Sequence, residues 1–146
     1  LVQSRQQLMT AIVQAVVGAM RRDPKRPGAE VGLKTPSIHS DLLWTLHSNN
    51  NIAEALRRFG VSRTTRTLIL VRVAPPLDAG ELVQHMSQLV DGTLQTHGLS
   101  LPSPALAWNE LGQTYKIQDT PAFQHQDTSQ VDALICSMVA SKYVGA

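Results

Sequence analysis

This chain of 146 residues lacks most of the features that would assign it to a secreted or membrane class. It has one cysteine, Cys136, which excludes an internal disulfide and suits a reducing compartment. No apolar run is long enough to cross a bilayer, and no signal-peptide pattern opens the chain. Aromatic residues amount to only 4%, so aliphatic side chains must fill the core. The length and the 42% of hydrophobic residues predict a single domain over 1–146.

The chain also has little that predicts catalysis or metal binding. His39, Ser40 and Asp41 are triad residue types, but neighbours in a strand point to opposite faces and cannot converge. The five histidines are scattered, and no two of them have the i, i+4 spacing of zinc ligands. Cys136 lies in an apolar helical pattern, which favours a buried structural thiol over a nucleophile. With no glycine-rich phosphate loop either, we expect a binding protein without catalytic residues, cofactor or metal.

Charge is unevenly distributed along the chain. Up to Arg72 there are eleven Lys and Arg against four Asp and Glu, and from Val73 onward there are two against seven. A basic half is typical of nucleic-acid binding, whereas two solvated faces of opposite sign are the simpler interpretation. Within the basic half, segment 21–32 combines proline, glycine and charge, and we predict that it is an exposed basic loop.

The most informative segment runs from 47 to 73. Asn51 is the predicted N-cap of a helix, and Glu54 stands where it would complete a capping box. Ile52, Ala55, Leu56 and Phe59 recur at helical spacing, and Gly60 predicts a left-handed helix end. The apolar run 67–71 that follows predicts a strand buried on both faces.

A second strand is predicted upstream, over 38–46, so that strand, helix and strand form a βαβ-type unit. Residues 115–117 predict a brief edge strand. Helical patterns cover 8–19, 78–90, 104–112 and about 130–143, and 121–129 reads as a polar connection. The predicted fold class is therefore α/β, with a mixed β-sheet, flanking helices, a βαβ-type central unit and a C-terminal helix.

Several blocks resemble one known family, the small kinase-binding subunit of the KEOPS/EKC tRNA-modification complex (the TPRKB family). Residues 48–61 are similar to the family's central phrase SxxNIxEALxxFGI nearly position for position. Residues 33–35 resemble its Met-Lys-Thr entry to a strand, 115–117 its IYKL block, and 132–138 its DAIIxxM helix. The basic loop looks like an insertion, and the family's N-terminal strand and helix are absent from this chain.

This resemblance implies a non-catalytic, regulatory subunit in the cytoplasm and nucleus. Its partner would be the small atypical kinase/ATPase subunit (PRPK or Bud type), with the other subunits contacted indirectly and no membrane involved. The complex installs threonylcarbamoyl on adenosine of tRNA and has telomere roles. The implied kinase contact falls on the last helix, at Leu134, Ile135, Met138, Val139 and Tyr143. Of these, Val139 and Tyr143 are outward candidates together with Cys136, while a plain core role for Leu134, Ile135 and Met138 is equally open.

The alternative function is a direct tRNA-binding module that presents the tRNA 3′ end to the complex. Its candidate phosphate contacts are Lys34, Arg57, Arg58, Arg63 and Arg66, because such contacts need only a positive surface. No aromatic platform accompanies these residues, so base stacking is not predicted.

Overall fold

The structure, a computed structural model, describes residues 1–21, 32–75, 78–95 and 104–144. Its regular elements are α1 (Arg5–Met20), α2 (Ile38–Leu46), α3 (Ile52–Phe59), α4 (Ala79–Ser87), α5 (Pro104–Tyr115), α6 (Pro121–Gln124) and α7 (Thr128–Ala140). No strand occurs in the described residues, so the prediction of an α/β fold with a mixed sheet is wrong. Except for Arg21 and Gly32, the predicted basic loop lies outside the described residues.

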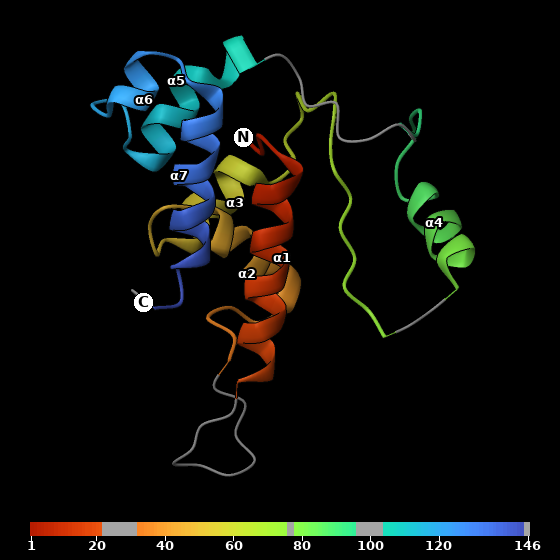
Figure 1. Cartoon of the computed structure of the whole chain (residues 1–146). Coiled ribbons are helices and arrows are strands. Elements are labelled where there is room, and N and C mark those ends of the chain that lie inside the picture. Colours follow the sequence, from red (N-terminus) through yellow and green to blue (C-terminus); the bar gives the residue numbers. More distant parts are fainter. Residues whose placement is uncertain (22–31, 76–77, 96–103, 145–146) are drawn as a thin grey trace.

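The core lies where α1, α2, α5 and α7 meet. Helices α1 and α7 run side by side, with α2 packed against α1 and α3 against α2 (Figure 1). Each core helix contributes residues four apart, which places them on one face. These buried residues are Ala11 and Ala15, Leu42 and Leu46, Leu111 and Tyr115, and Val131, Ile135 and Val139. Helix α4 stands apart from this bundle in Figure 1, and none of its residues is buried.

Helix α2 replaces the strand predicted over 38–46. Ser37 caps it, accepting from the Ser40 amide at 3.1 Å, while the Ser40 hydroxyl accepts in return from the Ser37 amide. This reciprocal pair is a capping box, which nucleates a helix. The apolar residues that follow fit a helical period as well as a strand period. The capping box favours the helix over the strand.

The run 67–71, predicted as a buried strand, is irregular, and all of it except the half-buried Val71 is exposed. Leu68, Ile69 and Leu70 are 37–39% exposed. A strand is stabilised by a neighbouring backbone, and this run makes no backbone–backbone hydrogen bond with other described residues. Apolar and β-branched composition is therefore not sufficient here, and the predicted βαβ-type unit is absent.

The predicted N-cap of α3 is confirmed, but its two other end signals are not. The Asn51 side chain accepts from the amides of Ala53 and Glu54, at 3.0 and 3.3 Å. The Glu54 carboxylate pairs with arginines instead of completing a capping box. Gly60 has φ −78° rather than the predicted left-handed conformation. Glycine is needed there because a Cβ would lie 2.3 Å from the Leu56 carbonyl oxygen.

Near the C-terminus, helices replace the predicted edge strand and polar connection. Helix α5 passes through Gly112 and ends at Tyr115, where the left-handed φ of 55° at Lys116 turns the chain. Thr120 caps the short α6 by accepting from the Phe123 amide. The helices predicted over 8–19, 78–90 and 130–143 are confirmed as α1, α4 and α7, with shifted bounds.

Replacement of Tyr115 by phenylalanine tests the two buried hydrogen bonds at the centre of this core. The buried Tyr115 hydroxyl donates to the Leu46 carbonyl at 2.5 Å and accepts from Gln7 Nε2 at 2.8 Å. Tyr115→Phe leaves both partners unpaired, which costs about 1–3 kcal/mol of unfolding free energy. Urea denaturation followed by circular dichroism measures this loss. An unchanged denaturation midpoint would show that the hydroxyl contributes nothing to stability.

Candidate functional site

Helix α7 presents two different faces. Asp127 caps it, and its inner row of Val131, Ile135 and Val139 is fully buried. After Gln130, its exposed row consists of small residues, Ala133, Ser137 and Ala140. Between the rows lie half-buried side chains, namely Asp132, Leu134, Cys136 and Met138.

The residues predicted to contact a kinase therefore divide into two groups. Ile135 is fully buried, and Leu134 and Met138 are half-buried. The outward orientation predicted for Val139 and Tyr143 is wrong, since they are only 1% and 7% exposed. These two side chains hold α7 against the bundle, so any partner contact on α7 must use the half-buried and exposed rows.

The end of α7 is fastened to α2 through a buried carboxylate. The Tyr143 hydroxyl donates to Asp41 Oδ2, and Asp41 Oδ1 accepts from the amides of Lys34 and Thr35 at 2.8 and 2.9 Å. Burial raises the pKa of Asp41, while these amide hydrogen bonds oppose the rise. The Tyr143 ring also meets Trp44 edge-on, with the ring centroids 5.5 Å apart. One acidic side chain thus joins the entry to α2, α2 itself and the C-terminal turn.

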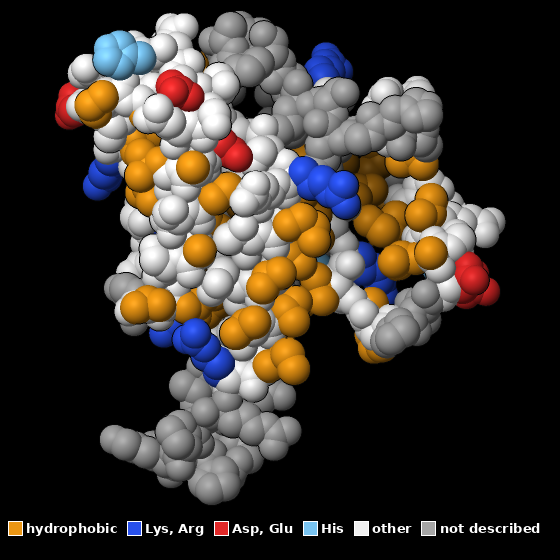
Figure 2. All heavy atoms as spheres, viewed as in Figure 1, with side chains coloured by type: hydrophobic (Ala, Val, Ile, Leu, Met, Phe, Trp, Pro, Cys, Tyr) orange, Lys and Arg blue, Asp and Glu red, His pale blue; other side chains and the backbone are white. Residues whose placement is uncertain are grey.

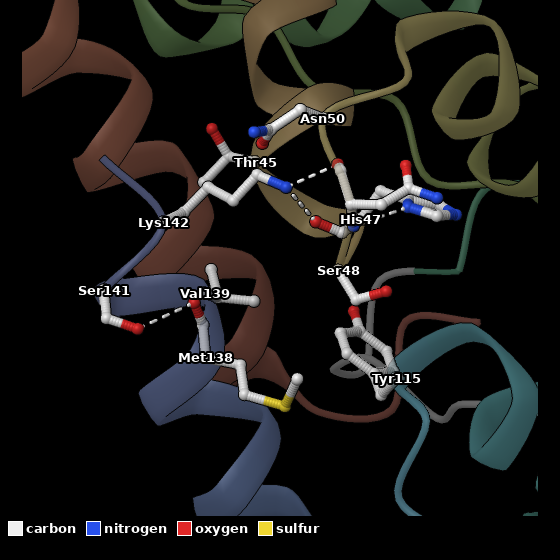
Figure 3. Close-up of a pocket in the computed structure, with 10 residues that line it drawn as sticks. Thr45, His47, Ser48, Asn50, Tyr115, Met138, Val139, Ser141 and Lys142 are labelled. Carbon is white, nitrogen blue, oxygen red and sulfur yellow. Dashed lines mark hydrogen bonds between the residues drawn. The ribbon is translucent and has the colours of Figure 1, made fainter. Parts of the chain in front are cut away.

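Lys142 is buried beside this junction, with 8% of its surface exposed. Its ammonium donates to the carbonyl oxygens of His47 and Asn49, at 2.6 and 2.5 Å (Figure 3). It also lies 4.6 Å from the centroid of the Trp44 ring, a cation–π contact. Burial lowers the pKa of Lys142 to about 8.

A cavity of about 400 Å³ opens beside the Lys142 ammonium, between the turn after α2 and the end of α7. Met138 and Val139 form an apolar wall, while His47 and Asn50 are polar and come from the α2–α3 turn (Figure 3). None of the described residues that line it is an Asp or a Glu. Burial, followed by the Lys142 charge, lowers the pKa of His47, so this ring is neutral at pH 7.

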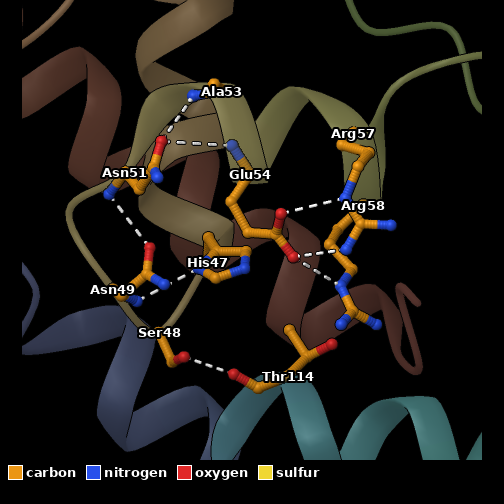
Figure 4. A network of polar contacts seen from close by, with 9 residues as sticks. All are labelled: His47, Ser48, Asn49, Asn51, Ala53, Glu54, Arg57, Arg58 and Thr114. Carbon is orange, nitrogen blue, oxygen red and sulfur yellow. Dashed lines mark hydrogen bonds and ion pairs between the residues drawn. The ribbon is translucent and has the colours of Figure 1, made fainter.

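The predicted tRNA contacts are not brought together as one cluster. Arg57 and Arg58 both pair with Glu54, with nitrogen–oxygen distances of 2.5 and 2.9 Å (Figure 4). Hydrogen bonds from these arginines lower the pKa of Glu54 to about 2. The other three residues, Lys34, Arg63 and Arg66, are exposed on loops before α2 and after α3. Glu54 therefore neutralises part of the basic surface, and direct tRNA contact stays a prediction.

Sequence reasoning missed an exposed apolar row on α1. Met9, Val13, Val17 and Met20 are 41–74% exposed, and their spacing places them on one face of the helix. Figure 2 shows exposed apolar side chains along the side of the molecule on which α1 and α7 lie. The sequence did contain a sign of this row, because α1 has more apolar residues than a single buried helix face requires.

Two classes of site find no support in the part of the chain that the structure describes. No group of His, Cys, Asp or Glu side chains there could hold a metal ion. None of the helices found there is long and apolar enough to span a membrane.

Comparison with known proteins identifies the family. The family model described as "Kinase binding protein CGI-121" matches residues 1–143 of this chain. The chain belongs to this family. This match confirms the resemblance to kinase-binding KEOPS/EKC subunits. In the sequence, that resemblance rests on blocks within residues 33–61 and 115–138. No solved structure matches the chain.

Named relatives of this CGI-121 family member are fungal subunits of the EKC/KEOPS complex. The subunit CGI121 of Gibberella zeae is 36% identical over 96 residues, which are 61% of this chain and 44% of the relative. That of Cryptococcus neoformans is 31% identical over 113 residues, or 76% of this chain and 48% of the relative. The Aspergillus terreus subunit is 38% identical over 63 residues, which are 42% of this chain and 32% of the relative. The matched part of this chain thus corresponds to less than half the length of these relatives.

The pKa of Lys142 gives a direct test of the buried junction. The value falls from 10.5 in the unfolded chain to about 8 in the folded one, so the unfolded state binds the extra proton between these pH values. The contribution of Lys142 to folding stability therefore rises with pH across that window. Carbon-13 NMR of the lysine Cε, assigned with Lys142→Met, should give a midpoint near pH 8. A midpoint above about 10, the ordinary lysine value, would contradict the burial.

Proposed function

We propose that this chain docks on the small atypical kinase/ATPase subunit of the EKC/KEOPS complex and so supports threonylcarbamoyladenosine modification of tRNA. The observation that carries the proposal is the match to the kinase-binding CGI-121 family over residues 1–143. The names of the fungal relatives support membership of the complex. Docking of this kind supplies coupling free energy between subunits and needs no reacting group on this chain.

The docking surface we assign combines α1 and α7. The α1 row (Met9, Val13, Val17, Met20) is apolar and lies on the helix that runs beside α7. Charged residues are nearly absent from both helices, with Arg5 alone on α1 and Asp132 alone on α7. The cores of protein interfaces are likewise depleted in charge and enriched in methionine. An apolar row of this length on one protein commonly marks a binding surface.

On α7 itself, the contact is assigned to the exposed row and the half-buried side chains next to it. Ala133, Ser137 and Ala140 are small, which lets a partner's backbone approach the helix closely. Met138 and Leu134 border this row and provide apolar surface. Ile135 and Val139 support the helix from behind, within the core.

A pull-down with the purified kinase subunit tests this assignment. Val13→Glu and Ala140→Glu place a carboxylate on exposed positions of α1 and α7. We expect each to reduce kinase affinity by at least about tenfold, because binding would desolvate the new charge. Both variants should keep the wild-type circular dichroism spectrum, since neither side chain is part of the core.

Val83→Glu on α4 is the matched control, because Val83 and Val13 are both 51% exposed. It should bind the kinase like the wild type. Wild-type binding by folded Val13→Glu and Ala140→Glu would refute the assigned surface. Failure of the unmodified chain to bind the kinase at all would refute the proposed function.

A further inference from the structure

The cavity beside Lys142 has an uncompensated positive charge. Lys142 is more than nine-tenths buried, yet none of the described residues that line the cavity carries a carboxylate. An ammonium has three donors, and the two acceptors it meets among the described residues are the carbonyl oxygens of His47 and Asn49. Neutral carbonyls and the Trp44 ring solvate the charge without cancelling it. A buried cation is normally paired, so the cavity lacks a counter-charge.

We propose that this cavity binds a small carboxylic acid, with its carboxylate on the Lys142 ammonium and an apolar tail against Met138 and Val139. The volume of about 400 Å³ falls within the range of small-molecule sites. The mixed lining, with one cation, a few polar groups and an apolar wall, is also typical of such sites. The cavity shares Met138 with the assigned kinase contact, but the carboxylate site on Lys142 is tested without the kinase and does not depend on that contact.

The charge count favours a carboxylate over a doubly charged phosphate. Lys142 supplies one positive charge, and the neighbouring His47 ring is neutral at pH 7 because burial and Lys142 lower its pKa. The two carbonyl oxygens on the same ammonium would repel a second negative charge. One ammonium and one carboxylate therefore balance, whereas a dianion would leave a buried charge unpaired.

The hydroxyl groups at the cavity are already engaged, whereas the Asn50 side chain is not. The Tyr115 hydroxyl bonds to Leu46 and Gln7, and the Ser48 hydroxyl donates to the Thr114 carbonyl. The Asn50 side chain is exposed and makes no hydrogen bond with another described residue. Figure 3 shows Asn50 and Lys142 on the same side of the cavity. The Asn50 amide is thus available as a second donor to the carboxylate.

The test is a titration of the full chain with 4-methylpentanoate, followed by NMR of Lys142 and by calorimetry. We expect saturable binding that is at least tenfold weaker for the neutral 4-methylpentanamide and for acetate, which lacks the tail. Equal binding of the amide would refute the role of charge, and equal binding of acetate would refute the apolar tail. Tighter binding of a tripeptide ending in leucine would overturn the assignment to a small molecule, and no saturable binding would overturn the proposal.

Two Asn→Asp variants, which change charge but not side-chain size, separate an effect on binding from an effect on folding. Asn50→Asp adds a negative charge at the cavity without removing a bond seen in the structure, because the Asn50 contact to Trp44 is made by its backbone oxygen. It should abolish binding of 4-methylpentanoate. Asn109→Asp makes the same charge change on an exposed residue of α5 outside the cavity lining, and should bind like the wild type. Wild-type affinity in folded Asn50→Asp would contradict the proposal.

Discussion

The buried hydrogen bond between Tyr143 and Asp41 is the contact on which the functional end of this molecule depends. Asp41 also accepts the amides of Lys34 and Thr35, so one carboxylate holds the entry to α2, α2 itself and the turn after α7. This bond fixes the position of the next side chain, Lys142, under the carbonyls of the α2–α3 turn. It also holds α7 with its apolar row inward and its small residues outward.

Local signals in the sequence predicted where helices start better than they predicted the helix ends or the fold class. The Asn51 cap, the Asp78 cap and the start of α5 at Pro104 follow from residue types alone. The predicted fold class is wrong because the apolar residues of runs such as 38–46 and 67–71 do not distinguish a helical period from a strand period. A capping box made the first a helix, and the lack of a pairing backbone left the second irregular. The residue types and order of 48–61 identified the family, and their periodicity predicted the helix α3, even though the fold class inferred from the flanking apolar runs was wrong.

The candidate site was less accessible to sequence reasoning than the family was. That α7 is an apolar helix could be predicted, but which edge faces outward depends on Tyr143 meeting a residue 102 positions away. The cavity could not be predicted either, because its lining comes from 45–50, 115 and 138–142. The exposed row of α1 was visible as surplus apolar residues. Positive charge alone made Arg57 and Arg58 candidate tRNA contacts, and it does not show that both pair with Glu54, three and four positions away.

The central claim is that α7 serves two surfaces, a core row that is always buried and an outer row that a kinase covers together with α1. Hydroxyl-radical footprinting of the chain, free and bound to the kinase subunit, tests this most directly because it reports the solvent exposure of individual side chains. The account predicts that Val13, Val17 and Met138 become protected on binding, while the exposed Val83 on α4 and Leu89 just after it keep their reactivity, because α4 stands apart from the bundle. Unchanged reactivity of α1 and α7 in the complex, with protection elsewhere, would contradict it.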